Sequence, residues 1–308
     1  MKKVFIDGSA GTTGLRIFER LAMRDDVEIL TLSEEKRKDA GARKEMLNSA
    51  DIAFLCLPDD AAREAVAMVE NPNVTIIDAS TAHRTLPDWA YGFPELSVSH
   101  EEKIVSSKRI AVPGCHASGL IALVYPLIEA GLLDKDALIT CHSITGYSGG
   151  GKKMIAEYES ETRNVLLGAP RQYAIGQQHK HLKEMQAMTG LKNAPVFCPI
   201  VSDFYSGMTV TVPLFASMLK GSVADVKAVY ANKYIGPIVR YQESVDEGGF
   251  ISGLALSSKD SMQVTVAGNE ERILLIAAYD NLGKGASGAA IECMNIALGA
   301  DKTKGLNV

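Results

Sequence analysis

The sequence has no long apolar run and few aromatic residues: it contains a single tryptophan in 308 residues, and Phe, Trp and Tyr together make up 6%. Its longest strongly apolar stretch covers residues 120–128 and is interrupted by Pro126. A membrane helix needs about 20 apolar residues. Only three apolar residues follow Lys2 and Lys3, too few for the core of a signal peptide. We therefore expect neither membrane association nor secretion.

Cysteine is also scarce: the five residues, at positions 56, 115, 141, 198 and 293, are odd in number and include no C-x-x-C pair. This pattern argues against a disulfide framework and against a zinc ribbon. We expect no metal site and a reduced, cytoplasmic protein. In that setting a functional cysteine is a nucleophile rather than a crosslink.

Positive charge is not in excess, because 32 Lys and Arg residues face 37 Asp and Glu residues, giving a net charge of −5. A general nucleic-acid binder needs such an excess to neutralise phosphates, so we expect no nucleic-acid partner. One small phosphorylated ligand in a local basic pocket remains compatible. The apolar content of 46% and charged content of 22% are those of a globular protein. At about 150 residues per domain, the length predicts two domains.

Apolar runs and helical patterns alternate in the first third of the chain. We expect strands at residues 4–6, 28–32, 52–57 and 74–77, and helices at 15–23 and 60–69, with a polar segment at 33–43. Continuous apolar strands separated by helices indicate a parallel sheet that is covered on both faces. The fold class is therefore α/β, with a Rossmann-like dinucleotide-binding domain at the start.

The later strands alternate between apolar and polar residues, at 138–145, 208–214, 261–267 and 273–278. A helix is expected at 223–234 and a final one at 287–298. Alternation means that one sheet face is buried, which predicts an α+β, mostly antiparallel second domain. No flexible linker is visible, so we place the boundary near Pro113. The first domain then covers residues 1–113 and 284–308, and the catalytic and oligomerisation domain covers 114–283.

A glycine-rich turn follows the first strand, with Gly8, Gly11 and Gly14 spaced as G-x-x-G-x-x-G. Glycine lets a pyrophosphate approach the backbone N–H groups at a helix start. The spacing differs from the common G-x-G-x-x-G, so its position in a βαβ unit carries the argument. We expect a dinucleotide here, although a turn without ligand is the alternative. The expected binding residues are Gly8, Ser9, Gly11, Thr12, Thr13 and Gly14.

The end of the second strand helps to distinguish NADP from NAD. A hydroxyl and basic side chains suit a 2′-phosphate, whereas an acidic residue suits a free ribose hydroxyl. Ser33 and the basic cluster Lys36-Arg37-Lys38 favour NADP, but Glu34 and Glu35 lie between them. The alternative, that these residues are only the charged, solvent-exposed start of a helix, agrees with the sequence nearly as well.

Cys115 stands where an apolar strand, residues 110–112, gives way to a helix that runs to about Ala130 and stops at Gly131. A thiol at a helix N-terminus lies at the positive end of the helix dipole, which stabilises the thiolate. We therefore predict that Cys115 is a nucleophile. The other four cysteines fall within apolar elements and are expected to be structural.

A nucleophilic cysteine needs a proton donor or acceptor. His179, His181 and Glu184 lie within six positions of one polar stretch, together with Lys180. A surface cluster without a role is equally compatible with the sequence. His116 could compete for the role, but we expect its ring to point away from the thiol.

A second glycine-rich segment reads Ser-Gly-Gly-Gly-Lys over residues 148–152. Backbone N–H groups and the ammonium group of Lys152 form a candidate cradle for an oxyanion or phosphate. It lacks the Walker A spacing, and a flexible loop is the alternative. We expect Ser148, Gly149, Gly150 and Lys152 to bind substrate.

Taken in order, these motifs resemble the N-acetyl-γ-glutamyl-phosphate reductases of arginine biosynthesis, in their shorter form, within the aspartate-semialdehyde dehydrogenase superfamily. The resemblance rests on residues 8–14, Pro113-Gly114-Cys115, residues 148–152, His179-Lys180-His181 and Asp280–Gly288. Longer members carry arginine where Lys180 stands, and a further arginine that the segment at 204–208 lacks.

The resemblance implies an attacking thiol at Cys115 and an acid/base imidazole in the His179/His181 pair, of which we favour His181. It implies NADPH as cofactor, with Asn281 near the nicotinamide, and we add Ser80 at the end of the fourth strand and Glu184 as a substrate residue. It also implies a homo-oligomer, a tetramer or dimer, that acts on a small acyl phosphate through a Cys115 thioester. The alternatives are an aspartate-semialdehyde dehydrogenase or another acyl-phosphate reductase, a non-catalytic dinucleotide sensor and, third, a cysteine hydrolase.

Overall fold

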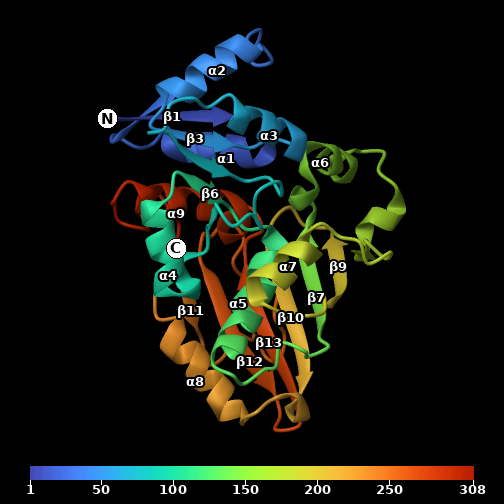
Figure 1. Cartoon of the computed structure of the whole chain (residues 1–308). Coiled ribbons are helices and arrows are strands. Elements are labelled where there is room, and N and C mark those ends of the chain that lie inside the picture. Colours follow the sequence, from blue (N-terminus) through green and yellow to red (C-terminus); the bar gives the residue numbers. More distant parts are fainter. The chain divides into compact units, whose positions relative to one another are not determined.

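The computed structural model describes residues 1–308 (Figure 1). The chain divides into two structural units. The first unit comprises Met1–Pro113 and Ala286–Leu306, and the second comprises Gly114–Gly285 and Asn307–Val308. The chain leaves the first unit after Pro113 and returns to it at Ala286, and its last two residues belong to the second unit.

The first unit contains a six-stranded sheet in the order β2-β1-β3-β4-β6-β5, and all of its pairings are parallel. The strands are β1 (Lys2–Asp7), β2 (Val27–Leu30), β3 (Ile52–Leu55), β4 (Thr75–Asp78), β5 (Ala90–Tyr91) and β6 (Arg109–Ala111). Every residue of β3 and β4 is buried, as expected for central strands covered on both faces. The predicted Rossmann-like sheet is confirmed.

Helices cover both faces of this sheet. They are α1 (Thr12–Leu21), α2 (Ala40–Ser49), α3 (Asp59–Ala67), α4 (Val98–Ser106) and α9 (Gly288–Ala297), with the short helix η1 (Pro94–Leu96). One apolar cluster joins the sheet to α1, α4 and α9, and the other joins it to α2 and α3. The sequence did not predict α2, because Leu47 is its one buried side chain. Asp39 caps this helix by accepting a hydrogen bond from the Ala42 N–H at 2.7 Å.

The second unit contains a seven-stranded sheet in the order β11-β12-β13-β10-β7-β9-β8. The strands are β7 (Thr140–Gly146), β8 (Arg171–Gln172), β9 (Val196–Ser202), β10 (Met208–Phe215), β11 (Val239–Tyr241), β12 (Met262–Gly268) and β13 (Arg272–Tyr279). Four pairings are antiparallel, whereas β11–β12 and β7–β9 are parallel. The sheet is therefore mostly antiparallel, as predicted. Strands β8 and β11 were not foreseen, and for β9 the sequence indicated only a strand-like run around Cys198.

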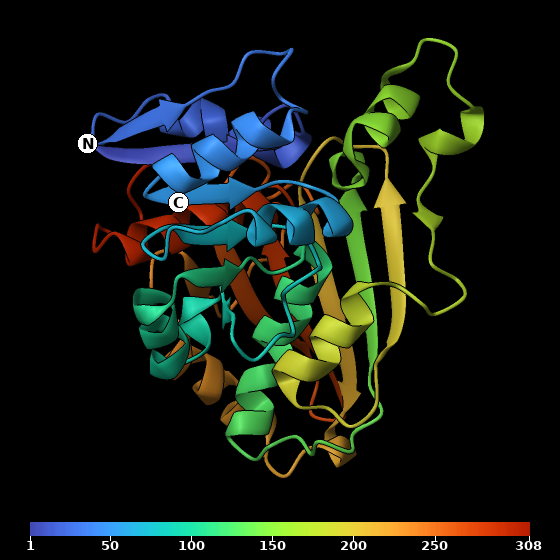
Figure 2. The same cartoon turned by 45° about the horizontal axis from the view of Figure 1, so that its top comes forward.

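Helices α5 (Cys115–Glu129), α7 (His181–Thr189) and α8 (Val223–Lys233) lie on one face of this sheet (Figures 1 and 2). Gly131 follows α5 with a φ of 73°, which matches the predicted helix end. The remaining helices are α6 (Gly151–Glu159), η2 (Tyr147–Gly150), η3 (Val165–Gly168), η4 (Ala216–Met218) and the π-turn η5 (Gly283–Ser287). No helix has the length and apolar character needed to cross a membrane.

Gly119 allows α5 to lie close to the sheet. A Cβ added at this residue would lie 2.6 Å from both Tyr279 Oη and Val210 Cγ2. These side chains come from β13 and β10, so the absence of a side chain at Gly119 sets the separation between helix and sheet. Well-packed interiors do not absorb such an overlap without movement.

We predict that Gly119→Ala lowers the free energy of unfolding by about 1–3 kcal/mol, because the added methyl group overpacks this contact. Urea denaturation followed by circular dichroism measures the change. Gly168→Ala is the control, since an added Cβ there meets no atom within 4 Å. Equal stability of the two variants would contradict the packing argument.

Candidate active site

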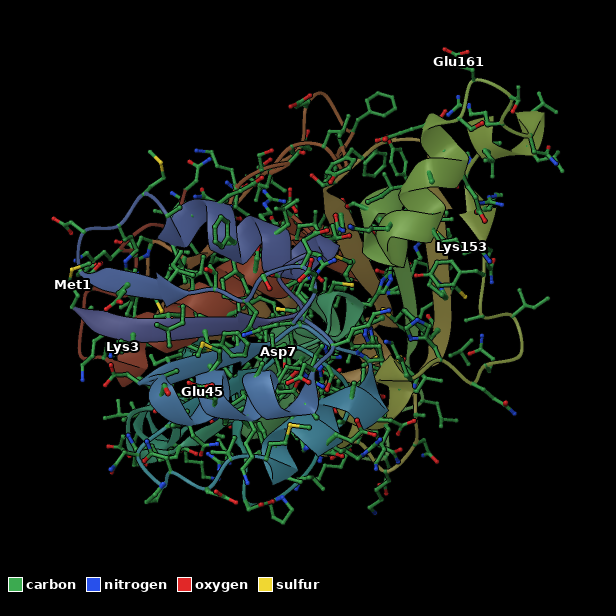
Figure 3. All side chains as sticks on the ribbon, turned by 90° about the horizontal axis from the view of Figure 1, so that it is seen from above. Met1, Lys3, Asp7, Glu45, Lys153 and Glu161 are labelled. Carbon is green, nitrogen blue, oxygen red and sulfur yellow. The ribbon has the colours of Figure 1, made fainter.

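The glycine-rich turn of the first unit requires glycine at two positions. Gly8 has a φ of 91°, and an added Cβ would lie 2.3 Å from the Cys56 carbonyl oxygen. A Cβ at Gly14 would lie 2.4 Å from the Gly8 carbonyl oxygen. The turn follows Asp7, the last residue of β1, which Figure 3 labels together with Lys3 at the other end of the strand.

The same turn is arranged to receive an anion. Helix α1 begins at Thr12 with Gly11 as its N-cap and has no side-chain cap, so its first N–H groups are available to a ligand. Strand β1 lies between β2 and β3, so the turn is at the point where the strand order reverses. Open α/β sheets bind their ligands at that point.

A cavity of about 510 Å³ opens beside this turn. The expected cofactor residues Gly8, Ser9 and Arg37 line it, whereas Ser33 does not. Gly11, Thr12, Thr13 and Gly14 form the start of α1 instead of the cavity wall. Lys38, from the predicted basic cluster, also lines the cavity, whereas sequence reasoning missed the contributions of Thr31, Leu32 and Arg43.

The cavity wall carries more positive than negative charge. Arg43 binds Asp7 through Nη2 at 2.9 Å and Nε at 3.1 Å, and both side chains are largely buried. Arg37 lies 3.3 Å from the Glu34 carboxylate at an exposed position. Lys38 is left without an ion pair on the same wall. Arg43 was missed because residues 40–49, which form α2, carry no periodic helical pattern.

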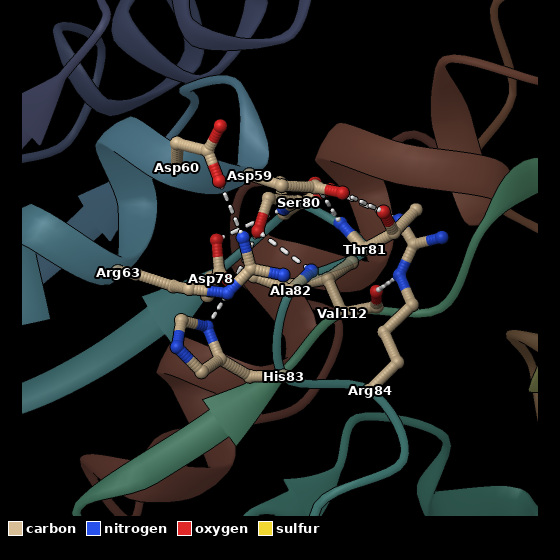
Figure 4. A network of polar contacts seen from close by, with 11 residues as sticks. Asp59, Asp60, Arg63, Asp78, Ser80, Thr81, Ala82, His83, Arg84 and Val112 are labelled. Atoms are coloured by element: carbon tan, nitrogen blue, oxygen red, sulfur yellow. Dashed lines mark hydrogen bonds and ion pairs between the residues drawn. The ribbon is translucent and has the colours of Figure 1, made fainter. Parts of the chain in front are cut away.

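The segment after β4 is held by a buried carboxylate (Figure 4). Asp78 accepts hydrogen bonds from the Ser80 backbone N–H at 2.9 Å and from its hydroxyl at 2.7 Å. The same carboxylate lies 2.6 Å from His83 Nδ1, and the His83 ring stacks on Trp89 at 4.1 Å. The expected cofactor residue Ser80 is thus buried and fixed by Asp78.

Two further contacts restrain this segment (Figure 4). Arg84 donates from Nε to the Val112 carbonyl at 2.8 Å and from Nη2 to the Ala79 carbonyl at 2.9 Å. Asp59, on α3, accepts hydrogen bonds from the backbone and hydroxyl of Thr81. The ends of β4 and β6 are therefore tied together at the sheet edge that carries the glycine turn. Sequence reasoning missed these residues, since none belongs to a periodic pattern.

In the second unit, the candidate nucleophile Cys115 is the first residue of α5, as predicted. Its carbonyl accepts a hydrogen bond from the Tyr279 hydroxyl, which in turn accepts one from the Gly119 N–H at 2.9 Å. The preceding Gly114 N–H donates to the Glu184 carboxylate at 2.8 Å. The backbone on both sides of Cys115 is therefore fixed, and its side chain is partly exposed at the positive end of the helix.

The other cysteines lie in different surroundings, although all five are free thiols. Burial, together with Asp78 and Asp7, raises the pKa of Cys56 to about 12. Burial and the neighbouring Cys198 also raise the pKa of Cys141. These two thiols stay protonated near neutral pH, in keeping with a structural role.

Three histidines of the second unit, His116, His179 and His181, form one cluster. The His179 and His181 rings lie 4.7 Å apart, and the His116 ring lies 5.8 and 5.7 Å from them. Burial and the charge of Lys180 lower the pKa of His179 to about 4. Burial and His179 lower the pKa of His116 to about 3. The structure thus brings the predicted pair together with His116, which was only a competing candidate in the sequence analysis.

Glu184 occupies the first turn of α7 and is buried. Its Oε1 accepts the hydrogen bond from Gly114, so this expected substrate residue positions the backbone in front of Cys115. Helix α7 packs closely against α5, and this packing brings Glu184 to Gly114.

The second glycine segment meets the Asp280-Asn281 turn. Ser148 is buried, and its hydroxyl accepts a hydrogen bond from Asn281 Nδ2 at 3.0 Å. A Cβ at Gly149 would lie 3.4 Å from the same nitrogen, and Asn281 Oδ1 accepts from the Gly207 N–H at 2.9 Å. The expected residues Ser148, Gly149 and Asn281 are therefore neighbours.

The other two expected substrate residues, Gly150 and Lys152, make no hydrogen bond with Asn281. Lys152 is exposed near the start of α6, and a Cβ at Gly150 would collide with Met154. Asp280 was not among the predicted site residues; it accepts hydrogen bonds from Ser206 Oγ at 2.8 Å and the Leu282 N–H at 2.6 Å. It is fully buried and fixes the turn that carries Asn281.

No group of three or more His, Cys, Asp or Glu side chains is arranged to hold a metal ion.

Comparison with known proteins places these features in a family. Residues 115–281 match the model described as semialdehyde dehydrogenase, dimerisation domain, and residues 38–104 match semialdehyde dehydrogenase, NAD binding domain. An N-acetyl-gamma-glutamyl-phosphate reductase 2 from Nostoc sp. is 44% identical over 319 aligned residues, covering 99% of each chain. An N-acetyl-gamma-glutamyl-phosphate reductase from Brucella ovis is 45% identical, covering 96% of this chain and 99% of the relative.

Solved structures share the fold at low sequence identity. Aspartate semialdehyde dehydrogenase II from Vibrio cholerae, complexed with ASA, superposes with a TM-score of 0.74 at 17% identity, covering 97% of this chain and 98% of that one. Aspartate semialdehyde dehydrogenase from Francisella tularensis gives a TM-score of 0.71 at 14% identity, with coverages of 96% and 99%.

The lowered pKa of His116 predicts that acid destabilises the protein. An unfolded histidine titrates near 6.5, whereas His116 in the folded chain takes up its proton only near 3. The protein therefore keeps its full stability above pH 6.5 and loses stability as the pH falls from 6.5 toward 3. At pH 5 the loss of unfolding free energy due to His116 is about 2 kcal/mol.

Lowering the pH from 7 to 5 should reduce the unfolding free energy of the parent protein. In His116→Gln, which lacks this imidazole, we expect that reduction to be smaller by about 2 kcal/mol. Urea denaturation at both pH values measures the difference. His142→Gln, which replaces an exposed imidazole on β7, is the control. An unchanged pH dependence in His116→Gln would show that the folded protein protonates this imidazole as readily as the unfolded chain does.

Proposed function

The chain belongs to the N-acetyl-gamma-glutamyl-phosphate reductase family of the semialdehyde dehydrogenases, and we propose that it catalyses the reaction described by that name. N-acetyl-glutamyl 5-phosphate is reduced to N-acetyl-glutamate 5-semialdehyde with release of phosphate, a step of arginine biosynthesis. The observation that carries this proposal is the position of Cys115 at the N-terminus of a buried helix, in a chain about as long as its relatives.

Cys115 performs the first half of the reaction. Its thiolate attacks the acyl carbon, a carbon–sulfur bond forms, and the carbon–oxygen bond to phosphate breaks. The product is a thioester on Cys115. Donors near the start of α5 and in the Ser148-Gly149 segment stabilise the negative oxygen of the tetrahedral state. Covalent capture also holds the carbonyl in place for the second half.

The cavity beside Gly8 and Arg37 would hold the nicotinamide dinucleotide, which when bound would supply the hydride that reduces the thioester carbonyl. The resulting thiohemiacetal on Cys115 then collapses, which breaks the carbon–sulfur bond, releases the aldehyde and restores the thiolate. The histidine pair moves the proton of the carbonyl oxygen. The pKa of about 4 makes His179 neutral near pH 7, hence a proton acceptor, and His181 at the start of α7 is our choice for the donor.

We assign NADPH as the preferred cofactor on the basis of the charged cavity wall. Lys38 and Arg37 lie beyond β2, where the ribose of a dinucleotide is bound in this fold. A 2′-phosphate gains charge-assisted hydrogen bonds from these cations, whereas a ribose hydroxyl does not.

We propose that the chain forms a homo-oligomer through the second sheet. The face opposite α5 exposes apolar side chains from three neighbouring strands: Ile144 on β7, Phe215 on β10 and Leu274 on β13. An exposed apolar surface of this kind marks an interaction site. A dimer through this face, or a tetramer built from two dimers, is the assembly that we expect. The five free thiols suit the reducing cytoplasm.

We expect Cys115→Ser to abolish phosphate-dependent turnover while leaving NADP binding nearly unchanged, because the cavity that we assign to the cofactor belongs to the first unit. Turnover is followed as NADP reduction with aldehyde and phosphate, and binding by calorimetry. Cys198→Ser is the control. Full activity of Cys115→Ser would exclude the covalent mechanism.

The substrate is tested with N-acetyl-glutamate semialdehyde and aspartate semialdehyde in parallel assays. Turnover confined to the acetylated aldehyde supports the proposal. Turnover confined to aspartate semialdehyde would keep the chemistry and change the substrate. If neither aldehyde reacts and NADP still binds tightly, the protein is a dinucleotide sensor.

For cofactor choice, Lys38→Ala should weaken NADP binding about tenfold and leave NAD binding unchanged, since it removes one charged hydrogen-bond donor. Lys44→Ala is the matched control, because Lys44 pairs with Glu70 outside the cavity. Equal losses for NADP and NAD in Lys38→Ala would argue against a 2′-phosphate contact.

A further inference from the structure

The backbone of the segment before α7 pairs with the outer edge of β9 over a short distance only. Strand β8 ends at Gln172, and the Tyr173 N–H then donates to the Pro199 carbonyl at 3.0 Å. Pro199 has no N–H, so its backbone needs no further partner at this edge. Two residues earlier in β9, the backbone groups of Phe197 point to the same edge, because strand residues alternate in the direction of their hydrogen bonds.

The Gln177 side chain takes over this pairing. Its Oε1 accepts a hydrogen bond from the Phe197 N–H at 2.9 Å, and its Nε2 donates to the Phe197 carbonyl at 2.7 Å. One amide thus makes the pair of hydrogen bonds that a residue of a neighbouring strand would make. The edge of β9 is satisfied at Phe197 although the backbone of the segment has turned away.

A strained turn delivers this side chain to β9. Ala174 and Gln177 have φ values of 49° and 54°, in the left-handed region that few non-glycine residues adopt. The Gln177 N–H donates to the Ala174 carbonyl at 3.0 Å and closes the turn. Strained conformations of this kind persist where the surroundings hold them, and they cluster at functional sites. The two hydrogen bonds from Gln177 to β9 are contacts that hold this turn.

The Phe197 ring is the surface on which two imidazoles pack. It is buried, and its centroid lies 5.3 Å from that of His179 and 5.4 Å from that of His116, both edge to face. His179 follows Gln177 by two residues, and its ring lies 4.7 Å from that of His181. The Gln177 amide therefore connects the segment that carries His179 to the residue on which the His179 ring rests.

We infer that Gln177 is a positioning residue for proton transfer: its amide, bonded to the Phe197 backbone, holds the His179 ring against Phe197 and beside His181. The inference rests on the proposed function, in which this histidine pair moves the proton of the carbonyl oxygen. Gln177 hydrogen-bonds to neither imidazole and acts through Phe197. A displacement of about 1 Å at a catalytic group can cost about a hundredfold in rate.

Other titratable groups face His179 from each element around it. Lys180 and His181 belong to the start of α7, His116 lies on α5, and the Tyr173 ring, after β8, is 5.9 Å away. None of these side chains hydrogen-bonds to the Gln177 amide, so each keeps its own contacts when the amide is removed. A change in the titration of His179 is then assigned to the position of its ring.

The first readout is the titration of the His179 imidazole in Gln177→Ala, followed by NMR, with His179→Gln identifying the signal. In the parent protein, burial and Lys180 hold the pKa of His179 at about 4. Without the amide the ring is free to move from Phe197 toward water. We therefore expect the midpoint to rise by about one pH unit, toward the ordinary value of histidine.

The second readout is turnover of the aldehyde that the parent protein uses. We expect kcat of Gln177→Ala to fall about tenfold, because the proton is transferred from a displaced ring. KM should stay the same, since the amide bonds only to Phe197 and removes no contact to substrate. A loss of stability alone would change neither the midpoint nor kcat of the folded protein.

Gln178→Ala is the matched control. It removes the same side chain from the next residue, which is exposed and makes no hydrogen bond to the rest of the chain. Its midpoint and its kcat should equal those of the parent protein. If Gln177→Ala fails to fold, Gln177→Met takes its place, because it keeps the length of the side chain and lacks the amide.

The titration uses no substrate, so the inference and the proposed function fail separately. An unchanged His179 midpoint in Gln177→Ala would overturn the inference and leave reductase activity, where present, intact. A raised midpoint with an unchanged kcat would overturn it as well, since the position of the ring would not matter to the reaction. If neither aldehyde reacts, the proposed function fails, and the midpoint alone decides whether Gln177 positions His179.

Discussion

The Tyr279 hydroxyl connects the first turn of α5 to the second sheet, and the candidate catalytic site depends on this contact. It donates to the Cys115 carbonyl and accepts from the Gly119 N–H, while Gly119 itself leaves room for the ring. Glu184 holds the N–H of Gly114, one residue before Cys115. The nucleophile is thus fixed through its backbone, and its side chain is partly exposed. A rigid backbone with an accessible thiol is what repeated covalent capture requires.

Carboxylates recur at the ends of elements in both units. Asp78 and Asp280 are fully buried, and each accepts a hydrogen bond from a backbone N–H a few residues further along the chain. Because these carboxylates receive hydrogen bonds, their burial does not leave an unpartnered charge. The turns that carry Ser80 and Asn281 therefore have defined conformations before any ligand binds.

The sequence predicted what depends on local pattern. The parallel sheet, the glycine turn and the start of α5 at Cys115 all have short-range signals in spacing and residue type. Arg43 could not be predicted, because it enters its site on α2, a helix that lacks a periodic signal. Strand β9 was predicted only as a strand-like run around Cys198: Pro199 lies within it, and its parallel pairing with β7 joins segments far apart in the chain. The contact between His116 and the other histidines likewise arises from tertiary packing.

The return of α9 to the first unit has a consequence for biosynthesis. Its residues Ile291, Met294 and Ile296 belong to the same buried cluster as Val4 and Ile52 of the first sheet. Domains generally fold as the ribosome releases them, the N-terminal one first. Here the first unit cannot complete its core until almost the whole chain has been synthesised. The intervening second unit is therefore free to fold on the ribosome while the N-terminal sheet still exposes an apolar face, which is a natural target for a chaperone.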